Sequence, residues 1–225
     1  MGFPASLPPT ADRQQVEAAA FVLSLRSRGF RDTAVLGAME RVPRDLFAPR
    51  RFADLARTDV SLPLACGQTM TAPAIVAAML VALGVGPGQR VLEIGTGSGY
   101  VTALLARLAG HVTSVERFGT LATEAGQRLA VAGLADRILL ETGDGLAPRA
   151  HGARFDRVLV NGAVGALPPA LTSLVAPGGR LVGAVAAEGG PRLLRLERGA
   201  DGALHQELGS PLRLSPLAAG RAAAL

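Results

Sequence analysis

The chain of 225 residues contains a single cysteine, Cys66, and only three histidines. One cysteine cannot form an intramolecular disulfide, and it also excludes zinc sites built from clustered cysteines. The histidines are far apart in the sequence and match no metal-ligand spacing, so we expect no metal site. The chemistry of this protein should therefore depend on side chains other than thiolates and imidazoles.

Long apolar runs are also missing. The longest one, Ala72 to Val85, has 14 residues and is interrupted by Gly84, whereas a helix that spans a bilayer needs about 20 residues. The amino-terminal segment MGFPASLPPTADR lacks the basic start, apolar stretch and small-residue cleavage site of a secretory signal. We therefore expect a soluble protein of the cytoplasm that has no membrane partner.

Lysine and tryptophan are absent, and Tyr100 is the only tyrosine. All 23 basic residues are arginines, and the net charge is +5 with a pI near 11.0. Such a charge could attract nucleic acid, but the arginines are scattered and the aromatic side chains on which bases stack are scarce. We interpret the arginines as the result of a codon bias toward G and C, and we expect no nucleic-acid partner.

Hydrophobic residues make up 49% of the chain, which is enough to build a full-sized core. Apolar periodicity predicts two amino-terminal helices, at 13–28 and 32–41, followed by an irregular segment at 48–71. From residue 73 onward, short apolar strands alternate with helices, which is typical of βαβ units around a mainly parallel sheet. The predicted strands lie at 90–94, 111–116, 138–142, 157–160 and 180–185. The predicted helices of this part lie at 75–83, 100–109, 120–132 and 168–175.

Two further apolar runs, at 192–197 and 208–214, predict an antiparallel pair at the edge of the sheet. We therefore predict an α/β fold with a doubly wound, mainly parallel sheet, amino-terminal helices and an antiparallel carboxyl-terminal edge. One compact domain is expected, in which residues 1–72 form the helices and the irregular segment and residues 73–225 form the α/β core. The sequence leaves the order of the strands open.

The segment VLEIGTGSGY, residues 91–100, is the most informative motif. Gly95, Gly97 and Gly99 separate a predicted strand from a predicted helix, where a chain turns sharply and a ligand can approach the backbone. Their spacing, G-x-G-x-G, differs from the dinucleotide fingerprint G-x-G-x-x-G. Glu93 precedes them and would attract an ammonium or sulfonium cation, whereas it would repel a pyrophosphate. The motif therefore indicates a cofactor with a cationic amino-acid end.

Two more acids follow at the ends of the next predicted strands. Glu116 lies 21 residues after Gly95, close to the spacing of about 20 expected for a carboxylate that binds ribose hydroxyls. Asp144 follows the third strand in the sequence TGDG, directly before Gly145. A structural turn would need the glycines but not these acids, so the combination favours S-adenosylmethionine binding. For Glu93 an alternative role remains, in which it orients the turn by binding its backbone amides.

With these motifs, the chain resembles the protein-L-isoaspartate O-methyltransferases, a family of class I S-adenosylmethionine-dependent methyltransferases, over most of its length. VLEIGTGSGY, the SVER around Glu116 and the GDG around Asp144 are similar to the cofactor motifs of this family. The segment RSRGFRDTAVLGAMERVPRDLF is similar to its amino-terminal helices, and PGGRL at 177–181 also fits. The segment DVSLPLACGQTMTAP, residues 59–73, resembles the family pattern D-x-x-L-P-I-G-x-G-Q-T-I-S-x-P, which lies beside the reactive methyl group.

The resemblance implies an enzyme that uses S-adenosyl-L-methionine to esterify the free α-carboxylate of L-isoaspartyl residues in damaged proteins or peptides. It implies that Thr71 donates a hydrogen bond to this carboxylate, and that Asp59, Gln68 and Thr69 shape the same wall of the site. An alternative role for Thr71 is to cap the helix that follows it. The residues that the resemblance assigns to the cofactor are Glu93, Gly95, Thr96, Gly97, Ser98, Gly99, Glu116, Asp144 and Gly145.

Four segments depart from the family pattern. Thr71 stands where the pattern has serine, and the sequence GAV at 162–164 replaces A-A-P. Residues 183–186, GAVA, replace L-P-V-G, and residues 214–217, LSPL, replace F-V-P-L. By the resemblance, all four line the acceptor rather than the cofactor. Two alternatives therefore remain: a paralogue with another carboxylate or small-molecule acceptor, and a cofactor-binding regulatory protein without turnover. The oligomeric state is left open.

Overall fold

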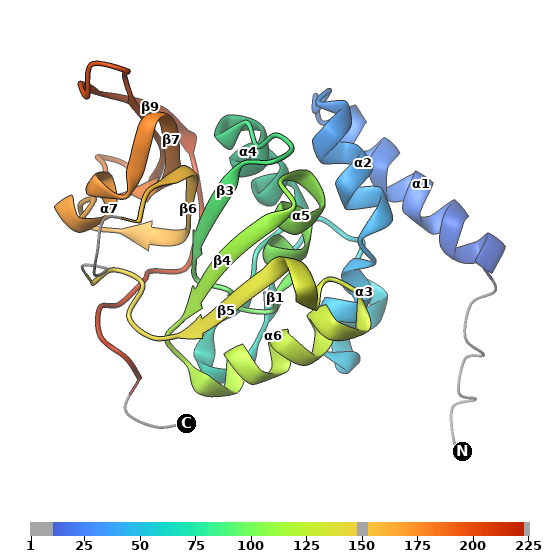
Figure 1. The fold of residues 1–225 in the computed structure, drawn as a ribbon. Coiled ribbons are helices and arrows are strands. Elements are labelled where there is room, and N and C mark those ends of the chain that lie inside the picture. The colour runs from blue at the N-terminus through green and yellow to red at the C-terminus, as the bar shows by residue number, and fades with distance from the viewer. Residues whose placement is uncertain (1–10, 148–152, 223–225) are drawn as a thin grey trace.

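The computed structural model describes residues 11–147 and 153–222, and its centre is a seven-stranded sheet (Figure 1). The strand order is β5-β4-β3-β6-β7-β8-β9. The strands from β5 to β7 in this order are parallel, whereas β8 and β9 are antiparallel to their neighbours. The bounds of the strands are β3 Arg90–Ile94, β4 His111–Glu116, β5 Ile138–Thr142, β6 Phe155–Val164, β7 Val175–Val185, β8 Arg192–Arg198 and β9 Leu204–Pro211. The predicted α/β class, with a mainly parallel sheet and an antiparallel edge, is confirmed.

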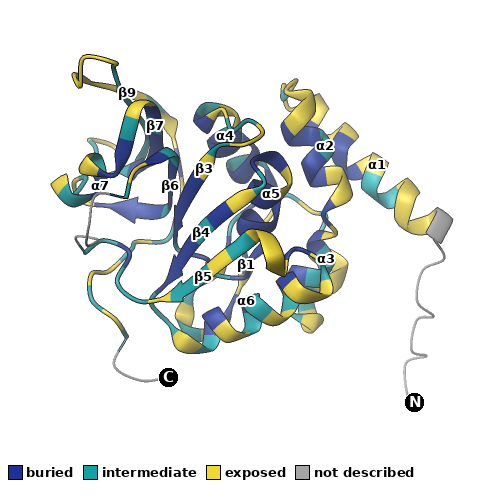
Figure 2. Ribbon diagram, in the orientation of Figure 1, coloured by how far each residue is buried: buried dark blue, intermediate teal, exposed yellow. Residues whose placement is uncertain are grey.

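The buried residues, dark blue on the ribbon of Figure 2, belong to two clusters, one on each face of the sheet. Successive residues of a strand point to opposite faces, so Val91 belongs to the first cluster and Leu92 to the second. The first cluster lies under helices α1, α2, α4, α5 and α6, and the second lies under α7. The bounds of the helices are α1 Ala11–Ser27, α2 Thr33–Arg41, α3 Arg44–Phe47, α4 Pro73–Leu83, α5 Tyr100–Leu108, α6 Gly119–Val131 and α7 Pro169–Ser173. Within the described part of the chain, no helix combines the length and apolar character that a membrane crossing requires.

The order of the strands reverses between β3 and β6, which are neighbours in the middle of the sheet. From β3 the chain winds outward through β4 to β5, and it then returns to β6 and winds in the other direction through β7. In open sheets of this kind, ligands bind outside the carboxyl ends of the strands at the point of reversal. This topology places the glycine-rich turn after β3 beside the end of β6.

The carboxyl-terminal hairpin differs from the prediction. Its second strand, β9, covers Leu204–Pro211 instead of 208–214. The turn closes where the N–H of Gly199 donates to the carbonyl of Ala203 at 2.8 Å, and the strand begins directly after it. Most side chains of β9 are exposed. Because backbone hydrogen bonds form such an edge strand whichever side chains it carries, the apolar pattern does not mark its beginning.

The segment 48–71, predicted to be irregular, contains two short 3₁₀ turns, Arg50–Leu55 and Ala65–Gly67, and a small ladder. The ladder joins β1 (Leu62–Pro63) to β2 (Thr69–Met70) in antiparallel pairing. It folds the segment back on itself shortly before the start of α4. The pairing is too short to produce a strand pattern in the sequence.

Cys66 lies in this segment with φ 57° and ψ 26°, and it is the one non-glycine residue with positive φ among those described. The left-handed region costs other residues about 1–2 kcal/mol, whereas glycine adopts it freely. We therefore expect Cys66→Gly to keep or raise the melting temperature, by up to a few degrees. Cys66→Val, which adds a branched Cβ, should lower it. Differential scanning calorimetry of both variants tests this. A clearly lower melting temperature for Cys66→Gly would contradict the inference that the backbone of Cys66 is strained.

Candidate active site

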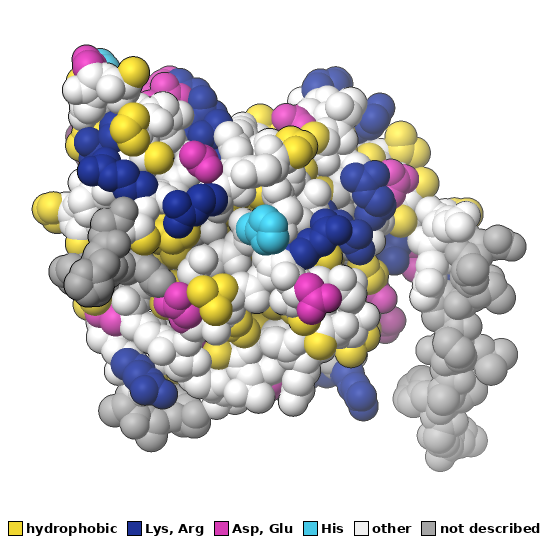
Figure 3. All heavy atoms as spheres, viewed as in Figure 1, with side chains coloured by type: hydrophobic (Ala, Val, Ile, Leu, Met, Phe, Trp, Pro, Cys, Tyr) yellow, Lys and Arg dark blue, Asp and Glu magenta, His cyan; other side chains and the backbone are white. Residues whose placement is uncertain are grey.

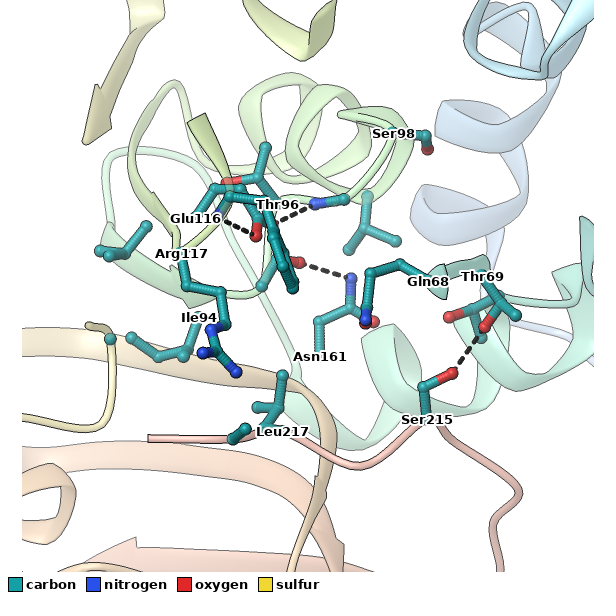
Figure 4. A pocket seen from close by; sticks show the side chains of 18 of the residues that line it. Gln68, Thr69, Ile94, Thr96, Ser98, Glu116, Arg117, Asn161, Ser215 and Leu217 are labelled. Carbon is teal, nitrogen blue, oxygen red and sulfur yellow. Dashed lines mark hydrogen bonds between the residues drawn. The ribbon is translucent and has the colours of Figure 1, made fainter. Parts of the chain in front are cut away.

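A cavity lies at the carboxyl ends of β3, β4 and β6, where the strand order reverses (Figure 4). Its walls come from the turn after β3, the ends of β4, β5 and β6, and the two segments 68–71 and 215–218. The predicted site residues that line it are Gln68, Thr69, Thr71, Gly95, Thr96, Gly97, Ser98, Glu116, Asp144 and Gly145. Asp59, Glu93 and Gly99 are not among the lining residues.

Glycines keep the floor of the cavity open. Gly95 has φ +94°, and a Cβ at this position would lie 3.2 Å from the carbonyl oxygen of Asn161. A Cβ on Gly145 would lie 2.5 Å from Cγ2 of Ile94, which is closer than real side chains approach. Gly99 serves another purpose, because it begins α5 and a Cβ there would meet Ala125 of α6 at 3.2 Å. Gly99 therefore permits close packing of two helices rather than contact with a ligand.

Glu116 holds the glycine-rich turn and also faces the cavity. Its Oε2 accepts a hydrogen bond from the N–H of Gly97 at 2.9 Å, and its Oε1 accepts one from the N–H of Phe118 at 3.0 Å. A carboxylate can accept about four hydrogen bonds. Two lone-pair positions therefore remain for hydroxyl groups of a ligand, as the ribose assignment requires.

Asp144 connects the end of β5 to the carboxyl-terminal segment. Its Oδ1 accepts from the N–H of Leu146 at 2.9 Å, and its Oδ2 accepts from the N–H of Gly220 at 2.7 Å. Like Glu116, it keeps lone pairs for a further donor. These contacts are therefore compatible with its predicted role in cofactor binding.

Glu93 lies beneath the turn and is fully buried. Its Oε2 accepts hydrogen bonds from the hydroxyls of Thr102 at 2.5 Å and Ser114 at 2.7 Å. Ser114 also bonds to the hydroxyl of Thr96 at 2.6 Å. Burial raises the pKa of Glu93 to about 7, although the hydroxyls of Thr102 and Ser114 favour the ionised form. Glu93 thus braces the turn through hydroxyl groups, not through the backbone amides considered as its alternative partners.

The side of the cavity that is predicted to hold the acceptor includes Thr71. Its hydroxyl makes no hydrogen bond with any described residue, and the N-cap of α4 is Ala72, which has no side-chain cap. The alternative that Thr71 caps this helix is therefore wrong. The buried guanidinium of Arg44 donates from Nη2 to the backbone carbonyls of Thr71 at 3.0 Å and Val60 at 3.3 Å, and from Nη1 to that of Ala56. Arg44 thereby holds the backbone of Thr71 in place.

Asp59 supports the same wall without lining the cavity. Its Oδ1 accepts from the N–H of Ala74 in the first turn of α4 at 2.8 Å. Its Oδ2 forms an ion pair with Arg28 Nη1 at 2.9 Å. A carboxylate at a helix N-terminus satisfies a free N–H group and interacts favourably with the helix dipole. Asp59 therefore positions the start of α4.

The carboxyl-terminal segment closes the other side of the cavity. The hydroxyls of Ser215 and Thr69 lie 2.7 Å apart, and the carbonyl of Ser215 accepts from the N–H of Ala163 at 2.9 Å. A Cβ on Gly162 would collide with the side chain of Leu217. The segments 162–164 and 214–217 therefore pack closely against each other. Both depart from the family pattern.

The sequence reasoning did not identify Tyr100, Arg117, Phe118 and Asn161, all of which line the cavity. Arg117 and Phe118 directly follow Glu116, and Asn161 directly follows the predicted strand 157–160. A polar residue at the carboxyl end of a parallel strand is the signal that identified Glu116 and Asp144. Applied to this strand as well, it would have indicated Asn161.

Comparisons with known proteins agree with this geometry. The family model described as Protein-L-isoaspartate(D-aspartate) O-methyltransferase matches residues 16–222. A protein-L-isoaspartate O-methyltransferase of Methylorubrum populi is 45% identical over 200 residues, which covers 89% of this chain and 93% of that protein. One of Azorhizobium caulinodans is 42% identical over 215 residues, which covers 96% of this chain and 99% of that protein.

The fold also matches that of a solved structure, described as a protein-L-isoaspartate O-methyltransferase of Plasmodium falciparum in complex with S-adenosyl-L-homocysteine. The TM-score is 0.80 at 20% sequence identity, and the match covers 88% of this chain and 97% of that one. At 20% identity this match supports a shared fold alone. The family model and the two bacterial relatives match the amino-acid sequence, and they establish the family. This chain belongs to the protein-L-isoaspartate(D-aspartate) O-methyltransferase family.

Proposed function

We propose that this protein is an S-adenosyl-L-methionine-dependent O-methyltransferase that esterifies the free α-carboxylate of L-isoaspartyl residues in proteins or peptides. Its family membership supports this reaction. The observation that carries the proposal is one cavity lined both by the glycine-rich turn with Glu116 and by Thr71, whose hydroxyl is unpaired among the described residues. A cofactor and an acceptor carboxylate could meet there.

The residues of the cavity fit the cofactor. The turn of residues 95–98 would hold its amino-acid end and sugar region, Glu116 its ribose hydroxyls, and Asp144 with Gly145 its adenine. When bound, S-adenosylmethionine supplies a methyl group, which forms a bond to the acceptor oxygen as its bond to sulfur breaks and S-adenosylhomocysteine leaves. The open floor at Gly95 and Gly145 and the spare lone pairs of Glu116 are the features that support this fit.

The chain itself has to align the acceptor and exclude water. A carboxylate is already anionic at neutral pH, so the reaction requires no strong general base. Alignment of the reacting atoms can lower the barrier by about 7–11 kcal/mol. In our proposal, Thr71 donates a hydrogen bond to the acceptor carboxylate while Arg44 holds the backbone of Thr71. The hydroxyl pair of Thr69 and Ser215 joins the acceptor wall to the carboxyl-terminal segment.

We also propose that the protein acts in the cytoplasm on isoaspartyl-containing proteins and does not use nucleic acid as a partner. On the face shown in Figure 3, the arginine side chains lie in separate groups rather than in one patch. Several arginines have structural partners. Arg180, for example, pairs with Glu197 at 2.7 Å and donates to the carbonyl of Ala82 at the end of α4 at 2.9 Å.

Substitution of Thr71 tests the acceptor assignment. Thr71→Ser keeps the hydroxyl and removes a methyl group, so it should keep or raise methylation of an isoaspartyl peptide. Thr71→Val removes the donor and should lower kcat/KM by about 5- to 150-fold, the effect of leaving a buried polar partner without its hydrogen bond. The affinity for S-adenosylhomocysteine should not change. The measurement is methyl transfer to an isoaspartyl peptide, with its aspartyl twin as the unreactive control.

Two results would count against the proposal. Full activity of Thr71→Val would show that the hydroxyl does not bind the acceptor. A wild-type protein that binds S-adenosylhomocysteine tightly but does not methylate isoaspartyl peptides would favour another acceptor, or a cofactor-binding protein without turnover.

A further inference from the structure

Asn161 lies in β6 and lines the cavity, but no role toward cofactor or acceptor follows from the motifs described above. Its Nδ2 donates a hydrogen bond to the backbone carbonyl of Gly95 at 3.0 Å. Of the two polar atoms of the side-chain amide only Nδ2 can donate to a carbonyl oxygen, so this contact determines which way the amide is turned. The Oδ1 atom is therefore on the side of the amide that does not face the carbonyl of Gly95.

The Oδ1 atom of Asn161 is buried and has no hydrogen-bond partner among the described residues. Buried acceptors nearly always have a donor, because loss of their contact with water is otherwise uncompensated. The side chain of Asn161 belongs to the wall of the cavity, from which a bound ligand would approach this atom. The missing donor is therefore most simply one that a ligand brings.

The register of the sheet shows which part of a ligand reaches Asn161. Ile94 of β3 pairs with Val115 of β4 on one side and with Val160 of β6 on the other. The next residues, Glu116, Gly95 and Asn161, are therefore level with one another across three neighbouring strands. In Figure 4, Asn161 lies between Glu116 on one side and Thr69 with Ser215 on the other.

A cofactor with its ribose at Glu116 would cross the turn at Gly95, and the end opposite the nucleoside would meet the end of β6. In S-adenosylmethionine and S-adenosylhomocysteine this end carries an α-ammonium group, which has three N–H donors and no acceptor. The carbonyl oxygen of Gly95 and the Oδ1 of Asn161 are two neighbouring acceptors without a formal charge. Hydrogen bonds from charged donors to such oxygens are among the stronger ones in proteins.

We propose that Asn161 Oδ1 accepts a hydrogen bond from the α-ammonium group of the cofactor and makes the site selective for a ligand with an intact amino-acid end. The proposal rests on the proposed function, because it takes S-adenosylmethionine and S-adenosylhomocysteine as the ligands. Asn161 then has two tasks: its Nδ2 holds the turn at Gly95, and its Oδ1 binds the ligand.

The two tasks can be separated with two ligands and two variants. Isothermal titration calorimetry compares S-adenosylhomocysteine with its analogue in which hydrogen replaces the α-amino group. Wild type should prefer S-adenosylhomocysteine by about tenfold or more, the usual effect of a hydrogen bond with a charged partner. Asn161→Ala should remove most of this preference. Asn161→Asp loses the donor to Gly95 but keeps an oxygen for the ammonium group, so it should retain the preference even if both ligands bind more weakly.

The outcomes distinguish this proposal from the proposed function. If wild type and Asn161→Ala showed the same preference, or if both variants weakened both ligands equally, Asn161 would only brace the turn and the inference would be overturned. If wild type bound neither ligand, the cofactor assignment itself would fail. Asn161→Ser, whose hydroxyl is too short to span both partners, replaces the alanine variant if that protein does not fold.

Discussion

Replacement of Glu116 by alanine is expected to weaken the binding of S-adenosylhomocysteine by about 100-fold or more. The variant loses the carboxylate that would accept hydrogen bonds from the ribose hydroxyls, each worth about 1.5–3 kcal/mol. The N–H groups of Gly97 and Phe118 lose their acceptor as well, so the glycine-rich turn becomes less well ordered. Every 1.4 kcal/mol corresponds to about tenfold in affinity, and calorimetric titration of both proteins measures the difference.

Two further variants make this test specific. Glu124→Ala removes a carboxylate of α6 that forms an ion pair with Arg128 and does not line the cavity, so it should bind S-adenosylhomocysteine like wild type. Glu116→Gln keeps one acceptor oxygen, but its amide group would face a backbone N–H, and we expect an intermediate loss. Equal affinity of wild type and Glu116→Ala would contradict the ribose assignment. An absolute need for a divalent cation would contradict the site as a whole.

The second large effect concerns stability and pH, and it arises from Glu93. The pKa of this buried carboxyl is about 7 in the folded protein, against an ordinary value of 4.5. Between these values the folded protein holds a proton that the unfolded chain has lost, so the stability that Glu93 contributes falls as the pH rises. The two pKa values differ by about 2.5, and each pKa unit corresponds to about 1.4 kcal/mol. We therefore expect this contribution to decrease by about 3 kcal/mol between pH 4.5 and pH 8.

Comparison with Glu93→Gln isolates this effect, because glutamine has a similar shape and does not titrate. Its side-chain oxygen can accept from Thr102 and Ser114 as the carboxylate does. Urea unfolding of both proteins at pH 5 and pH 8 should show that the variant becomes more stable relative to wild type at the higher pH. Glu188→Gln, at an exposed position, should leave the pH dependence unchanged. Parallel pH profiles for wild type and Glu93→Gln would show that Glu93 does not titrate in this range.

The amino-acid sequence alone was enough to predict the fold class and much of the cavity lining around the glycine-rich turn. The α/β class follows from periodicity, which is a local property: apolar strands alternate with helices from residue 73 onward. The turn at Gly95, and the acids Glu116 and Asp144 at strand ends, were found in the same way. The topology of parallel sheets brings the carboxyl ends of neighbouring strands to one edge, so these residues meet in any arrangement that keeps their strands adjacent.

The side of the cavity around Thr71 depended on tertiary structure. Thr69 and Ser215 are 146 residues apart and lie in hydrogen-bonding contact, and Asp59 reaches α4 across an irregular segment. No periodicity encodes such pairs, because they result from the packing of distant segments against one another. The strand order is equally nonlocal, and it alone places Asn161 beside Gly95. Sequence patterns determined which elements form and which of their ends are polar, whereas the packing of those elements decided which polar groups share the cavity and which, like Glu93, are buried beneath it.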